Sequence, residues 1–157
     1  MGADLSYVNQ ILDHGGTYRD SGKIQDPYRI FADHGANVVR LRLFHTPRWT
    51  GEIYGEGTRP IYNHFKDVKK AIERARAEGM EVLLDFHYSD NWADPHKQNP
   101  PAAWESLDLG TLRDSIYQYT LQTLEKLEEE GLMPKYVQTG NEINPGFVLP
   151  QGNRWDG

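Results

Sequence analysis

Strand-like and helix-like segments alternate four times along the chain, beginning with a strand, which predicts an α/β fold with a parallel sheet. The predicted strands carry polar residues on one face, whereas the strands of a doubly wound sheet are apolar on both faces. The long loops follow strands and the short loops follow helices, as in barrels whose sites lie at the carboxyl ends of the strands. We therefore predict a (β/α)8 TIM barrel, of which this chain covers about the first four β/α units.

The length of the chain bears on the domain organisation. A complete barrel usually needs about 250 residues. Residues 1–157 are therefore expected to be the N-terminal half of a single domain, with no second domain. The first strand is not followed by a Gly-x-Gly-x-x-Gly motif, so the sequence lacks the usual signature of a dinucleotide-binding fold.

The strands are predicted from alternating side chains. Their expected ranges are 2–8, 37–44, 82–90 and a run that starts at residue 136. The second strand is the clearest, because apolar and polar residues alternate along it. Its two faces are Val39, Leu41 and Leu43 against Val38, Arg40 and Arg42. The corresponding faces of the third strand are Val82, Leu84 and Phe86 against Leu83, Asp85 and His87.

Three helices are predicted between these strands. The first begins after the capping residue Asp26 and stops at Gly35. The other two show apolar residues at helical spacing and stop at Gly79 and Gly131. Their apolar faces are Phe65, Val68, Ile72 and Ala75 in one, and Leu112, Ile116, Tyr119, Thr123 and Leu127 in the other. Residues 45–64, which include Trp49, are expected to form a long loop.

The composition excludes several classes of function. The net charge is −6, and no cluster of Lys and Arg suggests a surface for nucleic acid. No apolar run approaches the roughly 20 residues that a membrane span needs, and the N-terminus carries no signal peptide. Without Cys, the chain has neither disulfides nor thiolate chemistry.

Polar side chains at the strand ends are the candidates for chemistry. We expect Arg42, His87 and Glu142 to meet at the mouth of the barrel, where burial would make Glu142 an acid near neutral pH. Asn141, beside this acid, is expected to hold a substrate hydroxyl. A deeper layer is expected to form a structural network of hydrogen bonds and ion pairs. Its members are Arg40, Asp85 and Gln138.

The loop after the third strand allows more than one interpretation. Trp92, between Asp90 and Asp94, is either an anchor for the loop or a flat platform for a sugar ring. His87, Asp90, Asp94 and His96 lie close together in the sequence, but they show none of the spacings of familiar metal sites. We therefore expect no metal and no cofactor.

Several spaced segments resemble one known family. They are GADLSYV, GANVVRLRLF, DFHYSDNWADP, and VQTGNEINPG followed by LPQG. Together, from Gly2 to about Gly152, they resemble the endo-β-1,4-galactanases of glycoside hydrolase family 53, and they cover only the N-terminal half of the family domain. The resemblance implies a barrel that cleaves β-1,4-galactan, the side chains of type I arabinogalactan in pectin, by a retaining mechanism. It also implies a secreted, periplasmic or cell-surface protein, with its signal peptide absent from this sequence.

The resemblance also assigns roles to residues. Glu142 matches the acid/base catalyst and Asn141 the amide beside it, while Arg42 and His87 match active-site positions. The matching substrate-binding loop carries Asp90, Trp92 and Asp94. Two positions depart from the family, since Phe44 and Leu149 stand where it commonly has Trp, and Trp49 is a possible replacement. The nucleophilic Glu of the family comes from the seventh strand, which this sequence does not contain.

Two alternatives remain open for the chain itself. A galactan-binding protein would keep the Trp92 loop without hydrolysing the sugar. A half-barrel assembly unit would instead form a dimer through its open edges, because an open parallel sheet exposes unpaired strands. The assembly unit would bind no ligand, whereas the partner expected for the hydrolase or the binding protein is galactan or a galacto-oligosaccharide.

Overall fold

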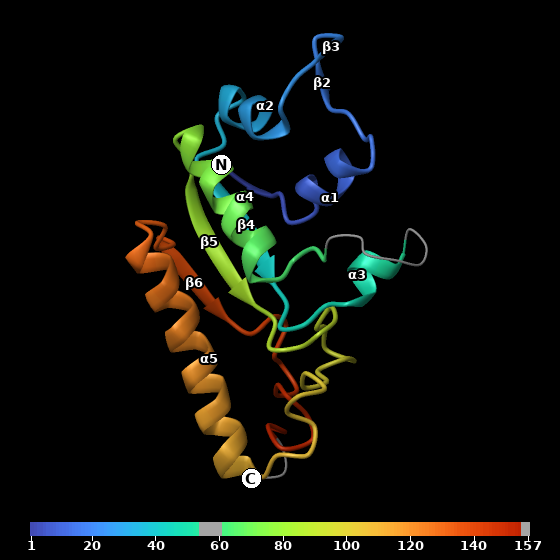
Figure 1. The fold of residues 1–157 in the computed structure, drawn as a ribbon, viewed down its shortest axis with the longest axis vertical. Coiled ribbons are helices and arrows are strands. Elements are labelled where there is room, and N and C mark those ends of the chain that lie inside the picture. Colours follow the sequence, from blue (N-terminus) through green and yellow to red (C-terminus); the bar gives the residue numbers. More distant parts are fainter. Residues whose placement is uncertain (54–60, 155–157) are drawn as a thin grey trace.

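The computed structural model describes residues 1–53 and 61–154. Its centre is a four-stranded sheet in the order β1 (Gly2–Asp4), β4 (Val38–Leu43), β5 (Glu81–Phe86) and β6 (Tyr136–Thr139). Neighbouring strands are parallel, with Val39 opposite Val82 and Leu84 opposite Val137. These strands follow one another across the sheet in chain order, which confirms the predicted run of β/α units (Figure 1).

The three predicted helices are present. They are α2 (Pro27–Asp33), α4 (Phe65–Ala77) and α5 (Leu109–Glu129). The carboxylate of Asp26 caps α2 by accepting the backbone N–H of Tyr28 at 2.8 Å, and Asp108 caps α5 in the same way. α4 packs on β4 and β5, and α5 runs beside β6 (Figure 1). The predicted apolar faces are confirmed, since Val68, Ile72, Ala75, Leu112 and Leu127 are buried in the core.

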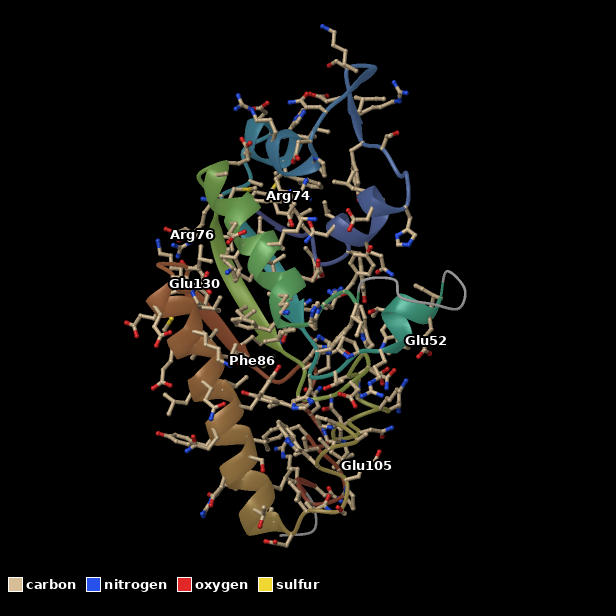
Figure 2. The ribbon with its side chains drawn as sticks, viewed as in Figure 1. Glu52, Arg74, Arg76, Phe86, Glu105 and Glu130 are labelled. Atoms are coloured by element: carbon tan, nitrogen blue, oxygen red, sulfur yellow. The ribbon has the colours of Figure 1, made fainter. Side chains whose placement is uncertain are left out.

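Polar contacts join α4 to α5 near the ends of both helices. Lys69 of α4 forms an ion pair with Glu130, the residue that follows α5. Arg76 of α4 donates hydrogen bonds to the backbone carbonyls of Gly131 and Met133. Arg76 and Glu130 accordingly lie at the same end of the two helices in Figure 2. These contacts hold the segment that follows α5 against α4.

The structure also contains short elements that were not predicted from the sequence. They are α1 (Val8–Asp13), the antiparallel pair β2 (Arg19–Asp20) and β3 (Lys23–Ile24), and α3 (Trp49–Glu52). α3 lies within the stretch 45–64 that was expected to be a loop, and residues 54–60 of that stretch are outside the described residues. Elements this short carry too few residues for a periodic pattern.

Two predicted strands are too long. The first ends at Asp4, because the Asp4 carboxylate accepts the N–H and hydroxyl of Ser6, which turns the chain toward α1. The third ends at Phe86 and not at residue 90, because the chain turns at Tyr88, whose φ is +50°. Among the described residues, no helix is both long and apolar enough to cross a bilayer.

The two faces of the sheet differ as predicted. The apolar face of β4 and β5 is buried against the helices, and Phe86, labelled in Figure 2, meets the Tyr119 ring of α5 at 5.9 Å. The opposite face carries Arg40, Arg42 and Leu83, which line a shallow hollow of about 400 Å³. In a closed barrel this face would be the interior. The alternation in β4 thus correctly predicts which side chains face the helices and which face the barrel interior.

Candidate active site

The stretch after β6 turns sharply and presents an acid. Gly140 has φ +94°, and a Cβ there would lie 2.6 Å from Ile143 Cγ2, so only Gly fits this position. Glu142 itself has φ +52°, the left-handed region that a residue with a side chain rarely occupies. Its side chain is exposed. The described residues therefore leave this acid uncovered, whereas burial was predicted for it at the mouth of the barrel.

Asn141 lies beside the acid and is buried, with 5% of its surface exposed. Its Oδ1 accepts hydrogen bonds from Arg40 at 2.7 Å and from Gln138 at 3.3 Å. Its Nδ2 donates to the backbone carbonyl of Ala93 at 2.8 Å. Three protein partners thus fix the amide, and the sugar contact predicted for it stays a prediction.

The deeper polar layer forms the network that the sequence predicts. Arg40 lies 3.0 Å from Asp4 and 2.5 Å from Asp85, in addition to its bond with Asn141. Asp85 is fully buried, and the guanidinium of Arg40 compensates its charge. Gln138 bonds the Gly140 carbonyl as well as Asn141. This layer ties three strands of the sheet to the turn that carries Glu142.

His87, predicted at the mouth with Arg42 and Glu142, is buried. Only 2% of its surface is exposed. Its Nδ1 accepts the N–H of Ala93 at 3.0 Å, so this nitrogen carries no proton. The proton is therefore on Nε2, which donates to Asp85 at 3.1 Å. The loop after β5 thus folds back over the ring, and the predicted meeting of His87 with Arg42 and Glu142 at the mouth stays a prediction.

The backbone of Ala93 is held by two of the candidate residues. His87 accepts from its N–H, and Asn141 donates to its carbonyl. This clamp places the neighbouring Trp92 over Arg42, whose guanidinium carbon is 4.0 Å from the centre of the indole ring. Trp92 also stacks on Tyr7, with the ring centres 6.4 Å apart. These contacts support the interpretation of Trp92 as a loop anchor.

Arg42 combines this aromatic contact with an ion pair. Its Nη2 lies 2.7 Å from Asp4 Oδ2, and 13% of its side chain is exposed. Asp4 therefore contacts both arginines of β4. Of the three residues predicted at the mouth, Arg42 is partly accessible, Glu142 is exposed and His87 lies beneath the loop.

The two aspartates of the loop organise the backbone. Asp90 accepts the N–H of Thr46 at 2.7 Å and that of Ala102 at 3.0 Å, which joins two loops. Its carbonyl accepts the indole N–H of Trp49 at 2.8 Å. Asp94 accepts the N–H of His96 in a local turn. In the part of the chain that the structure describes, no three His, Asp or Glu side chains are gathered in a way that could hold a metal ion.

Sequence reasoning missed three residues of this region. Asp4 was not among the predicted site residues, and Tyr7 carried no signal of its contact with Trp92. Gln98 was not singled out, although it is 3% exposed and its amide contacts the backbone beside Glu142. A polar residue in a loop gives no pattern that predicts burial, so no sequence signal pointed to Gln98.

Comparison with known proteins decides the family. A sequence model described as glycosyl hydrolase family 53 matches residues 1–156. The chain belongs to this family. It is 48% identical over 145 residues to an arabinogalactan endo-β-1,4-galactanase of Cellvibrio japonicus, and 44% identical over 152 residues to an endo-β-1,4-galactanase of Bacillus subtilis. These matches cover 92% and 94% of this chain, and 36% and 34% of the relatives.

Solved structures of family 53 have the same fold. A structure from a study of two fungal β-1,4-galactanases superposes with a TM-score of 0.87 at 35% identity, covering 99% of this chain and 43% of that protein. The catalytic domain of the Ignisphaera aggregans family 53 protein superposes with a TM-score of 0.86 at 37% identity, covering 97% and 42%. The chain therefore corresponds to part of a family 53 barrel, as predicted, and spans about two fifths or less of its relatives.

Proposed function

We propose that this chain contributes to an endo-acting glycoside hydrolase that cleaves β-1,4-galactan with retention, and that Glu142 is its acid/base catalyst. The observation that carries the proposal is an exposed Glu142 on a fixed turn at the carboxyl end of β6, in a family 53 sequence. Sites of such barrels lie at this end of the strands. The names of the galactanase relatives support galactan as the substrate.

In this mechanism Glu142 acts twice. Its carboxylic acid first protonates the glycosidic oxygen while a second carboxylate attacks the anomeric carbon, which breaks the glycosidic bond and forms a glycosyl-enzyme. The Glu142 carboxylate then takes a proton from water as the water attacks the same carbon and releases the second carboxylate. The second carboxylate is expected from a strand beyond this sequence.

The other candidate residues are either partly exposed or buried, and we propose different roles for the two groups. We propose that Arg42 and Trp92, both partly exposed, contribute to the wall of a sugar-binding cleft, and that Asp90 and Asp94 shape its loop. His87 and Asn141 act through the positions of Ala93 and Glu142. Because a polysaccharide does not cross a membrane unaided, we also propose that the protein works outside the cytoplasm.

The test uses a protein that carries these residues together with the rest of the barrel. Replacing Glu142 by Gln keeps its shape but removes proton transfer, so kcat on β-1,4-galactan should fall by about 100-fold or more. Glu125→Gln, an exposed residue of α5, is the matched control and should leave kcat unchanged. Galactan binding without hydrolysis by the unmutated protein would favour a binding function. Full activity of Glu142→Gln would remove Glu142 from the chemistry.

A further inference from the structure

Gln98 joins the loop after β5 to the turn that carries Glu142. Its Nε2 lies 2.8 Å from the carbonyl oxygen of Asn141 and 3.3 Å from that of Glu142. The same nitrogen lies 3.0 Å from the Asp94 carbonyl. Its backbone carbonyl accepts the N–H of Leu149 at 2.8 Å. With 3% of its surface exposed, Gln98 makes these bonds away from competing water.

The orientation of the amide follows from its surroundings. Three carbonyl oxygens lie around Nε2, and all of them are acceptors. A rotated amide would direct its own oxygen at these acceptors and leave them without a donor. The side chain therefore acts as a donor to the turn, and this function requires the NH₂ group.

The two peptides that Gln98 binds in this turn are those on either side of the Glu142 Cα. The carbonyl of Asn141 belongs to the peptide before that atom, and the carbonyl of Glu142 to the peptide after it. Their relative orientation is set by φ and ψ of Glu142. One side chain thus constrains both backbone angles of the residue whose φ is +52°. A left-handed conformation in a residue with a side chain persists only where the surroundings enforce it.

We infer that Gln98 is a positioning residue that holds Glu142 in its left-handed conformation and so aims the carboxyl group at the scissile bond. This inference rests on the proposed function of Glu142. Asn141 cannot replace Gln98 here, because its side chain is directed to Arg40, Gln138 and Ala93. Loss of the Gln98 donor frees the Glu142 backbone to relax, and a displacement of about 1 Å at a reacting group costs roughly 100-fold in rate.

The test compares Gln98→Met, Gln98→Glu and the control Gln10→Met in a protein with the complete barrel. Gln10 is also a buried amide, 5% exposed, but it donates to the Thr50 carbonyl at 3.3 Å instead of to the Glu142 turn. Gln98→Met should lower kcat on β-1,4-galactan by about 100-fold with KM little changed. Gln10→Met should change kcat by less than about threefold. Crystal structures of both variants report φ at Glu142, which should leave the left-handed region only in Gln98→Met.

The Gln98→Glu variant adds a pH readout that a merely structural role would not give. An ionised carboxylate has no donor and repels the carbonyls, whereas a protonated one donates a single hydrogen bond. The kcat of Gln98→Glu, relative to that of the unmutated protein, should therefore rise as the pH is lowered. An unchanged pH profile, or a positive φ at Glu142 together with full kcat in Gln98→Met, would overturn the inference. Failure of this inference can be told apart from failure of the proposed role of Glu142. If Glu142 were not the acid/base catalyst, Glu142→Gln would be active, whatever φ the Gln98→Met structure shows.

Discussion

The guanidinium of Arg42 lies 4.0 Å from the centre of the Trp92 ring, so a cation on β4 meets an aromatic residue from the loop after β5. Arg42 is held from the other side by Asp4, whose Oδ2 is 2.7 Å away. The backbone of Ala93, the residue after Trp92, is bonded to His87 through its N–H and to Asn141 through its carbonyl. The loop that covers the candidate site is therefore attached to the strand ends at several points.

We expect this contact to be measurable as a coupling energy. In a double-mutant cycle of Arg42→Met and Trp92→Leu, the two changes in unfolding free energy should be non-additive by about 1 kcal/mol, because the cation and the ring are partly shielded from water. Denaturant unfolding of the four proteins gives the value. A parallel cycle of Arg113→Met with Trp92→Leu should be additive, since Arg113 is paired with Asp114 on the surface of α5. Additivity in the first cycle would show that the contact contributes nothing.

Burial of two histidines predicts how stability varies with pH. Burial lowers the pKa of His45, against the opposing effect of Asp90, and burial likewise lowers the pKa of His64. The folded state therefore favours the neutral rings. Their contribution to stability is fully present above the unfolded pKa of 6.5, and it is lost as the pH falls through the lower folded pKa. Unfolding free energies measured from pH 7.5 downward should decrease. His45→Gln should reduce that slope, and an equal slope would contradict the prediction.

A buried carboxylate holds α1 against α4. Asp67 accepts Asn9 Nδ2 at 2.8 Å with one oxygen and the Asn63 N–H at 2.7 Å with the other. In Asp67→Asn one of these oxygens becomes a donor, so the variant should lose about 2 kcal/mol of unfolding free energy. Asp114→Asn, on the exposed face of α5, should change it by less than about 0.5 kcal/mol. Equal effects of both substitutions would mean that the Asp67 bonds do not stabilise the fold.

Some features of the fold and of the candidate site could be predicted from the sequence, and others could not. The alternation in β4 predicts its buried face and the inward position of Arg40, because side chains in a strand alternate strictly. The acid at the end of β6 was found because a strand end followed by Pro and Gly marks a loop. The burial of His87 could not be predicted, because it depends on how the following loop folds back. The Asp4–Arg42 pair likewise follows from strand register, which pattern alone does not fix.

The open edge of the sheet predicts self-association of residues 1–157 expressed by themselves. β6 pairs only with β5 in the described sheet, and Tyr136 and Val137 on it are 48% and 39% exposed. Unpaired edge strands recruit other strands. We expect a dimer at micromolar concentration in analytical ultracentrifugation, and Val137→Lys should weaken it because a charged edge residue opposes pairing. A monomer at all concentrations would contradict this expectation.

The same 157 residues, purified without the rest of the barrel, should release no product from β-1,4-galactan. A retaining mechanism needs a second carboxylate about 5–5.5 Å from the acid. The carboxylates nearest the strand ends are already engaged, since Asp4 pairs with Arg40 and Arg42, and Asp85 with Arg40 and His87. The side chain of Asp90 accepts the N–H groups of two loops. Freeing any of them as a nucleophile would leave a buried cation or backbone donors without a partner.

Reducing-sugar release by residues 1–157 should match a protein-free blank, while a protein with the complete barrel serves as the positive control. Release that disappears in Glu142→Gln would show instead that a carboxylate within these residues serves as the nucleophile.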